Sequence, residues 1–235
     1  FVERKVKQLN EDETIKEINN YYQKDLCKFI DNKCIEKYLT SDDSLVRNEK
    51  EILSINGERR AALLCKEPEM YNIDRVYTSK CVRTLQTAKY LMEMNGLTAT
   101  IDERLDERRV GIPNEGKHPD WFIKQYKDPE FKTENGESQK EVVARMNEAI
   151  NEILENDKDK RIAIFSHGYA ICFYLLQFAK LEYIDLDKNV RIKYKNKIIL
   201  DGQLNAPEVF KLTFNDKKLT DIEHLEFEEL KKTSV

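Results

Sequence analysis

A histidine that directly follows an apolar run is the residue with the clearest capacity for chemistry in this sequence. Ile162–Phe165 (Ile-Ala-Ile-Phe) leads straight into Ser166-His167-Gly168, and a second apolar segment covers residues 169–180. The run is typical of a strand buried on both faces, and the segment after it of a helix. His167 would then lie where α/β sheets bind ligands and where helix N–H groups favour anions. The pattern also fits a histidine in a tight turn without a chemical role.

Two further charged residues occupy positions where an anion could bind. A short strand is predicted at 73–77 and a helix at 78–94, so Arg83 lies near the strand-to-helix turn. Glu107 lies in a charged loop that follows a strand predicted at 98–101. Arg83 is equally consistent with a surface residue of the first helical turn. Glu107 is equally consistent with a solvated ion pair.

Strands and helices alternate along the chain and then give way to strands alone. Helices are predicted where apolar residues recur at helical spacing: residues 10–38, 57–65, 78–94, 138–156 and 169–180. Strands are predicted at residues 73–77, 98–101, 162–165, 190–200, 208–214 and 219–227. Ser138 and Glu141 have the spacing of a capping box. This order predicts an α/β fold: a three-layer α/β/α sandwich with a mostly parallel sheet and an antiparallel edge.

Composition narrows the class of protein. The 235 residues suit a single domain over 1–235 with a helical insertion at about 10–50. The near balance of 40 basic and 44 acidic residues argues against a nucleic-acid binder. Neither a membrane span nor a signal peptide is recognisable, so we expect a soluble, cytoplasmic protein. The five cysteines are scattered and never spaced as Cys-x-x-Cys, so we expect neither disulfides nor a zinc site.

The charged motifs occur together in an order that resembles a known family. The motifs are Thr78-Ser79 with Arg83 to Ala88, Leu105 to Gly111, Gly136-Glu137-Ser138 and Ser166-His167-Gly168. In order and approximate spacing they resemble the histidine phosphatase superfamily, the family of the cofactor-dependent phosphoglycerate mutases and many phosphomonoesterases. Residues 53–61 are similar to the family's helix entry and residues 205–214 to its late edge strand. The resemblance covers residues 53–227.

The resemblance implies a chemical role for each of these residues. In the family, a histidine of an Arg-His-Gly motif becomes phosphohistidine, two arginines and a second histidine hold the phosphoryl oxygens, and a glutamate protonates the leaving oxygen. Arg83 would be the second arginine, His167 the second histidine and Glu107 the proton donor. Phosphoryl transfer needs positive charge around these oxygens and a nearby acid, which agrees with these residue types. The implied ligand is a phosphorylated small molecule or a phosphate anion, with no metal and no cofactor.

The nucleophilic motif of the family is missing from the sequence. The three histidines are His118, His167 and His224, and none belongs to an Arg-His-Gly motif. When the first ten residues, Phe1 to Asn10, are laid on the family's first strand, Arg4 takes the place of the nucleophile. A guanidinium stays protonated, so Arg4 could bind a phosphate but could not attack one.

The missing nucleophile leaves two main functional hypotheses. The first is a histidine-phosphatase-like protein whose phosphate pocket contains Arg83, His167 and Arg4 and whose phosphoryl-transfer activity is lost or reduced. The second is an active phosphomonoester phosphatase whose Arg-His-Gly motif lies outside the sequence shown. A nucleotide-binding domain of another class is disfavoured because the glycine-rich phosphate motifs are missing. The helix predicted at about 10–38 either caps the domain or contacts a second copy or a protein partner.

Overall fold

The computed structural model describes residues 48–112 and 120–233. Arg4, His118 and the helix predicted at about 10–38 lie outside these residues. The proposed insertion at about 10–50 lies almost wholly outside them as well, so these features remain predictions.

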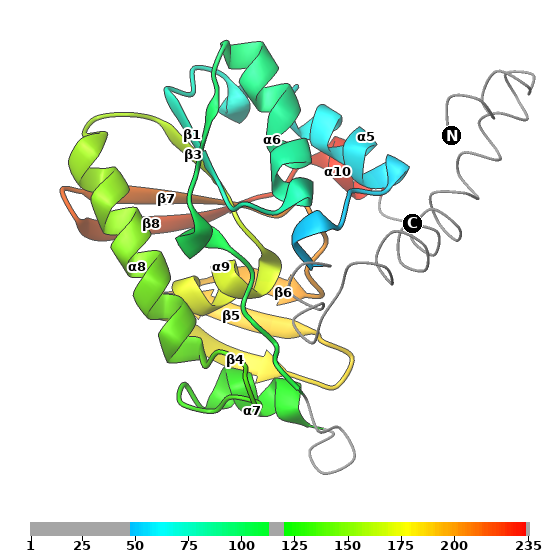
Figure 1. Cartoon of the computed structure of the whole chain (residues 1–235), viewed down its shortest axis with the longest axis vertical. Helices are drawn as coiled ribbons and strands as arrows, with labels where there is room; N and C mark the ends of the chain where they lie inside the picture. Colours follow the sequence, from blue (N-terminus) through cyan, green and yellow to red (C-terminus); the bar gives the residue numbers. More distant parts are fainter. Residues whose placement is uncertain (1–47, 113–119, 234–235) are drawn as a thin grey trace, which may run out of the picture.

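A parallel sheet carries the motifs that the sequence singled out. Its strand order is β2-β1-β3, with β1 (Arg75–Thr78) between β2 (Ala99–Ile101) and β3 (Ile162–Phe165) (Figure 1). Val76 of β1 lies opposite Ala99 on one side and Ala163 on the other. Because all three strands run in one direction, their carboxyl ends meet at one edge. The segments after β1 and β3 are therefore neighbours in space.

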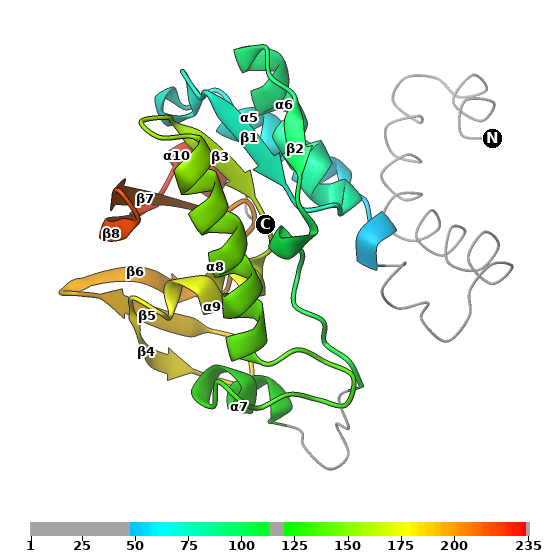
Figure 2. The same cartoon turned by 60° about the vertical axis from the view of Figure 1, so that its left-hand side comes forward.

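Helices cover both faces of this sheet. The helices of the described chain include α5 (Ile55–Leu64), α6 (Val82–Asn95), α7 (Trp121–Lys127), α8 (Gln139–Asn156), α9 (Gly168–Leu175) and α10 (Glu228–Lys231), with short 3-10 turns at Pro68–Met70 and Glu103–Leu105. In Figures 1 and 2, β1 and β3 lie between α8 on one side and α5 and α6 on the other. The side chains of β3 alternate accordingly, since Ala163 and Phe165 pack with the α5–α6 core and Ile164 with the α8–α9 core. The predicted layers on the two sides of the sheet are confirmed.

The longest helix begins where its sequence predicts. Ser138 accepts a hydrogen bond at Oγ from the Glu141 N–H (3.2 Å), and Glu141 Oε2 accepts one from the Ser138 N–H (2.8 Å). These two bonds form the predicted capping box, which satisfies two N–H groups that the helix itself cannot pair. This local signal fixes the start of α8.

Two antiparallel sheets follow the parallel one in the chain. They are formed by β4 (Lys180–Ile184), β5 (Val190–Tyr194) and β6 (Lys197–Gly202), and by β7 (Val209–Asn215) and β8 (Lys218–Leu225). The helix predicted over 169–180 is shorter, because α9 ends at Leu175 and Lys180 already pairs with Lys193 of β5. The predicted α/β class, with a parallel sheet and antiparallel strands late in the chain, is confirmed.

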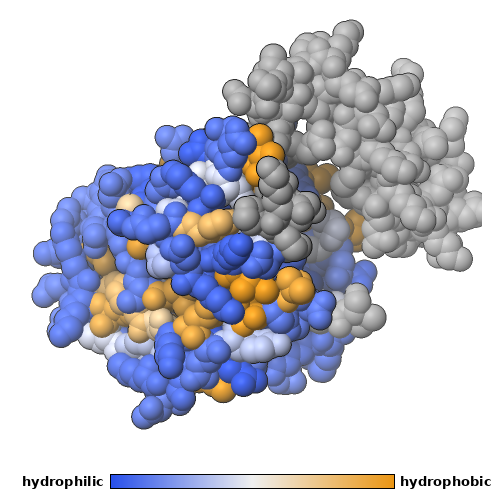
Figure 3. Space-filling view, turned by 90° about the horizontal axis from the view of Figure 1, so that it is seen from below, coloured by the Kyte–Doolittle hydropathy of each residue, from blue (hydrophilic) through white to orange (hydrophobic). Residues whose placement is uncertain are grey.

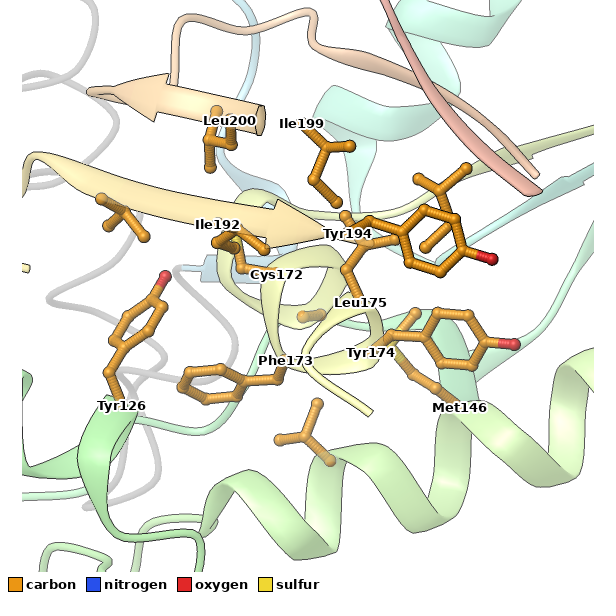
Figure 4. Packing of buried hydrophobic residues seen from close by; sticks show 14 of the residues in the cluster. Tyr126, Met146, Cys172, Phe173, Tyr174, Leu175, Ile192, Tyr194, Ile199 and Leu200 are labelled. Atoms are coloured by element: carbon orange, nitrogen blue, oxygen red, sulfur yellow. The ribbon is translucent and has the colours of Figure 1, made fainter. Parts of the chain in front are cut away.

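Helix α9 is the centre of the larger core. Its side chains Cys172, Phe173 and Leu175 are fully buried, and Figure 4 shows them between Met146 of α8 and the antiparallel strand that carries Ile192. A short, almost wholly apolar helix of this kind must be covered on all sides. The residues at its start are thereby held in a fixed position.

The surface is mostly hydrophilic with local apolar areas. Large exposed apolar side chains include Tyr183, Leu186 and Ile198, on or beside the β4–β5–β6 sheet. Figure 3 shows, on the face seen from below, a band of apolar side chains bordered by hydrophilic ones. Within the described ranges, no helix combines the length and the apolar character that crossing a bilayer requires.

Candidate functional site

Arg83 and His167 meet at the carboxyl edge of the parallel sheet. Arg83 lies in the first turn of α6, just after β1, and His167 is the N-cap residue of α9, just after β3. The Arg83 guanidinium donates from Nη2 to His167 Nδ1 over 2.9 Å. The structure thus brings together two of the residues that the sequence predicted for phosphate binding.

The contact with Arg83 fixes the proton of the imidazole. A guanidinium has only donors, so His167 Nδ1 must accept and the ring proton must lie on Nε2. Nε2 is 2.8 Å from Ser79 Oγ and donates to it. Ser79 Oγ is in turn 2.8 Å from Thr84 Oγ1, which donates to the Cys81 carbonyl (2.7 Å). Both ring nitrogens are therefore engaged in a buried hydrogen-bond chain.

His167 is neutral at ordinary pH. Its side chain is buried, with 5% of the residue exposed. Burial, together with the positive charges of Arg83 and Arg145, lowers the pKa of His167 to about 3. The imidazole therefore contributes hydrogen bonds to the site, while the positive charge comes from the arginines.

Arg145 is a cation of the site that the sequence reasoning missed. It projects from α8 and donates to the carbonyls of Arg104 and Asp106, each over 2.8 Å. It also forms an ion pair with Glu137 over 3.0 Å. Arg145 thus ties α8 to the loop that carries Glu107. The sequence does contain a feature that could have identified Arg145. The residue lies one position before Met146, within the apolar stripe of the helix, where a charged residue needs a specific partner.

The Glu107 carboxylate is hydrogen-bonded to the start of α9. Its Oε1 accepts hydrogen bonds from the Ala170 N–H (3.1 Å) and the Arg108 N–H (2.8 Å). The start of a helix favours an anion, and here a carboxylate of the protein itself pairs with the Ala170 N–H. Burial raises the pKa of Glu107 above its usual value, although these N–H groups and the Arg108 charge oppose the rise. A carboxyl group of this kind is suited to donate a proton.

The loop that carries Glu107 is held by the Gly136-Glu137-Ser138 motif. Arg109 donates its N–H to Glu137 Oε2 (2.7 Å), and the Glu137 N–H donates to the Arg109 carbonyl (2.8 Å). Gly111 has a φ of +69°, and a Cβ there would collide with the Glu134 carbonyl. A Cβ on Gly136 would collide with the Val110 carbonyl. The two glycines therefore permit the close approach that positions Glu107.

The guanidinium of Arg83 has further partners that an anion could replace. It donates to the backbone carbonyl of Asn48 and, over 3.0 Å, to the Asn48 side-chain oxygen. Glu51 lies 3.6 Å from it. An incoming phosphate would offer stronger, charge-assisted hydrogen bonds than the neutral oxygens of Asn48.

The predicted site residue Arg4 and the other two histidines, which were given no role in the site, complete the comparison with the sequence. Arg4 and His118 lie outside the described residues. His224 lies on β8, where it bonds Glu208 over 2.6 Å and stacks on Phe210. Within residues 48–112 and 120–233, no group of three or more histidine, cysteine or acidic side chains is arranged to hold a metal ion.

Comparison with known proteins places the chain in a family. The family model described as "Histidine phosphatase superfamily (branch 1)" matches residues 46–206. A probable phosphoglycerate mutase GpmB of Yersinia enterocolitica is 32% identical over 127 residues, and one of Cronobacter sakazakii is 30% identical over 128 residues. Each alignment covers 51% of this chain and 59% of the relative. The chain thus spans about three fifths of the length of these curated relatives.

Solved structures share the fold at low sequence identity. A mycobacterial glucosyl-3-phosphoglycerate phosphatase superposes with a TM-score of 0.53 and 16% identity, covering 67% of this chain and 89% of the other. Bacillus stearothermophilus YhfR superposes with a TM-score of 0.51 and 20% identity, covering 68% and 91%. At these identities the likeness concerns the fold alone.

Proposed function

This chain belongs to the histidine phosphatase superfamily, and we propose that it binds the phosphoryl group of a phosphorylated small molecule with phosphoryl transfer lost or much reduced. The observation that carries the proposal is the contact of Arg83 with His167 at the carboxyl edge of the sheet. It supplies a fixed cation and a polar imidazole at one point. Such a site favours an anion even when no bond to phosphorus is formed.

The proposed roles divide between charge and proton supply. Arg83 supplies the positive charge for the phosphoryl oxygens, and Arg4 would add a second guanidinium if the first ten residues follow the family's first strand. His167 can donate its Nε2 proton to a phosphoryl oxygen in place of Ser79, and its Nδ1 can donate to one only after this nitrogen has taken up a proton. Glu107 accepts a hydrogen bond from the Ala170 N–H, three residues after His167, and its carboxyl group would face the leaving oxygen.

The state of the two described histidines supports the proposed loss of transfer. His118 lies outside the described residues and His224 is paired with Glu208 on β8. His167 is buried, and its Nδ1 lone pair accepts from Arg83 while Nε2 carries the proton. A nitrogen without a free lone pair does not attack phosphorus.

A second candidate function is an active phosphomonoester phosphatase whose Arg-His-Gly motif lies outside the sequence shown. The observation in its favour is Glu107, because burial raises its pKa and so keeps a proton available for a leaving group. The names of the relatives, a probable phosphoglycerate mutase and a glucosyl-3-phosphoglycerate phosphatase, support a phosphorylated ligand under either candidate.

Two assays on matched variants test the proposal. Inorganic phosphate binding should be measured by calorimetry for the unaltered chain, for Arg83→Ala and for Arg191→Ala. Arg191 of β5 is the control, because it is a partly exposed arginine that pairs with Asp201 of β6 and takes no part in the proposed site. We expect Arg83→Ala to abolish binding and Arg191→Ala to leave it unchanged. Equal binding by all three proteins would refute the phosphate site.

The transfer assay separates the two candidates. Hydrolysis of an aryl phosphate should be negligible for the unaltered chain and should appear in Arg4→His if Arg4 replaces the nucleophile. Efficient turnover by the unaltered chain that disappears in His167→Ala would instead support an active phosphatase and overturn the first candidate.

We also propose that the chain is one domain that acts in the cytoplasm, and that the helix predicted at about 10–38 contacts a second copy or a protein partner. The mass in solution of the full chain and of a variant without residues 10–38 tests the contact. A folded monomer in both cases would exclude the contact with a second copy.

A further inference from the structure

A short segment that precedes α5, residues 48–51, lies across the Arg83 guanidinium. Asn48 alone supplies two oxygens: its backbone carbonyl accepts from Arg83 Nη1, and its side-chain oxygen accepts from Nη2 over 3.0 Å. The Glu51 carboxylate lies 3.6 Å from Nη1, and Nη2 also donates to His167. Each Nη atom therefore already has two partners. Oxygens on both Nη atoms are also the arrangement in which a phosphate pairs with an arginine.

The same segment contacts a second cation, Lys80. The Glu49 carboxylate lies 2.9 Å from Lys80 Nζ. Two carboxylates outside the segment also face this ammonium group, since Asp106 lies 3.5 Å and Glu103 lies 3.7 Å from it. The charge of Lys80 would therefore stay compensated if Glu49 moved away. The Lys80 side chain is 38% exposed, and ion pairs at such positions stabilise a fold only weakly.

The chain just after the segment is fixed independently of it. The Leu53 N–H donates to Gln86 Oε1 of α6 over 2.8 Å, and the Ser54 side chain caps the start of α5. Within the described residues, the hydrogen bonds and ion pairs that join residues 48–51 to other elements are those with the two cations. The segment can therefore leave the cations while α5 stays in place.

We propose that residues 48–51 form an autoinhibitory strap: they occupy the phosphate-binding face of Arg83, and a phosphoryl group binds there only by displacing them. The strap is a weaker ligand than a phosphate dianion, because Asn48 is neutral and the Glu51 side chain is 64% exposed. Only molecules with a released strap bind phosphate, so the strap raises the apparent dissociation constant. The inference rests on the proposed function, since it gives that site a closed state.

Weakening the strap should raise the affinity for inorganic phosphate, measured by calorimetry on the full chain. Asn48→Ala combined with Glu51→Gln removes two of the three contacts with Arg83 and should lower the Kd about tenfold, and Glu51→Gln alone about threefold. Glu103→Gln is the matched control, because this carboxylate also faces Lys80 but lies outside the strap. It should change the Kd by less than about twofold.

Trypsin cleavage after Lys50 reports on the strap itself. Cleavage there requires residues 48–51 to leave the fold, so its rate follows the population of the released form. Saturating phosphate should accelerate this cleavage about fivefold or more relative to chloride at equal ionic strength. Cleavage after Lys217, in the turn between β7 and β8, is the internal control and should keep its rate.

The outcomes separate the strap from the phosphate site. Phosphate binding that appears only in the strap variants supports both proposals. Equal affinity for the unaltered chain and the strap variants, with loss of binding in Arg83→Ala, refutes the strap and leaves the phosphate site intact. Tighter binding by the variants without faster cleavage after Lys50 shows that the carboxylate acts by charge alone, which also refutes the strap. Absence of binding in the unaltered chain and in both strap variants refutes the phosphate site and the strap together.

Discussion

The buried neutral state of His167 makes a quantitative prediction for the pH dependence of stability. In the unfolded chain this imidazole has a pKa near 6.5, and in the fold burial and two arginines lower it to about 3. Between these values the unfolded state binds more protons, so the free energy of unfolding rises with pH and falls on acidification. The stability from the neutral imidazole is fully present above pH 6.5 and is lost progressively as the pH drops towards 3.

The magnitude follows from the two pKa values. Lowering the pKa from 6.5 to about 3 disfavours protonation of the folded protein by roughly 4–5 kcal/mol. Each pH unit within this range should therefore remove about 1.4 kcal/mol, or about 2.7 kcal/mol by pH 4.5. His167→Gln removes the titrating group. On acidification, the unfolding free energy of this variant should therefore fall by about 1.4 kcal/mol less per pH unit than that of the unaltered chain.

Urea unfolding at half-unit steps from pH 7.5 to 4.5 measures these slopes. The slope is compared, not the absolute stability, because the substitution also alters the contacts with Ser79 and Arg83. His224→Gln is the matched control, since it removes a histidine of another cluster and should leave the contribution of His167 in place. Equal slopes for the unaltered chain and His167→Gln, or ring resonances of His167 that titrate near pH 6.5, would refute the buried neutral imidazole.

Three further substitutions probe the charges and the backbone of the site. Arg83→Lys should weaken phosphate binding by about tenfold to a hundredfold in calorimetry, because an ammonium cannot keep the paired donors of a guanidinium, whereas Arg191→Lys should not. Glu107→Gln should raise the free energy of unfolding more at pH 7 than at pH 4, since burial raises the pKa of Glu107 and penalises its charge mainly at the higher pH. An equal effect at both pH values in urea unfolding would contradict this. Gly111→Ala should cost clearly more stability than Gly96→Ala, for which about 1–2 kcal/mol is expected, because both have positive φ but only Gly111 lacks room for a Cβ. If Gly111→Ala and Gly96→Ala lose the same stability in thermal unfolding, the loop around Gly111 can shift to make room for the added Cβ.

Local signals and sheet topology account for what the sequence predicted correctly. Ser138 and Glu141 define the start of α8 through bonds within four residues, so no tertiary information was needed. Arg83 and His167 are far apart in sequence, yet each follows a parallel strand, and parallel strands bring such positions together. The α/β class and the meeting of these two residues could therefore be predicted.

Contacts set by tertiary packing could not be predicted. The hydrogen bond between Glu107 and the start of α9 depends on how the loop 105–111 is folded. That fold depends on Gly111 within the loop and on Glu137 and Arg145 from elsewhere in the chain. The length of α9 was overestimated because an apolar sequence allows both helix and strand, and pairing of Lys180 with β5 decides between them. The helix and strand propensities of these residues do not show which of the two structures will form.

The arrangement around His167 links anion binding to proton uptake. Burial is the main cause of the low pKa of the imidazole, and the charges of Arg83 and Arg145 lower this pKa further. A phosphate dianion beside Arg83 would offset the charge of the arginines. The pKa of His167 should therefore rise when phosphate binds, and at pH 6 the complex should take up a fraction of a proton. Calorimetric titration of phosphate in buffers of different ionisation enthalpy measures this uptake as the slope of the binding heat. His167→Gln should bind phosphate with a smaller slope, and an unchanged slope would place the anion away from the imidazole.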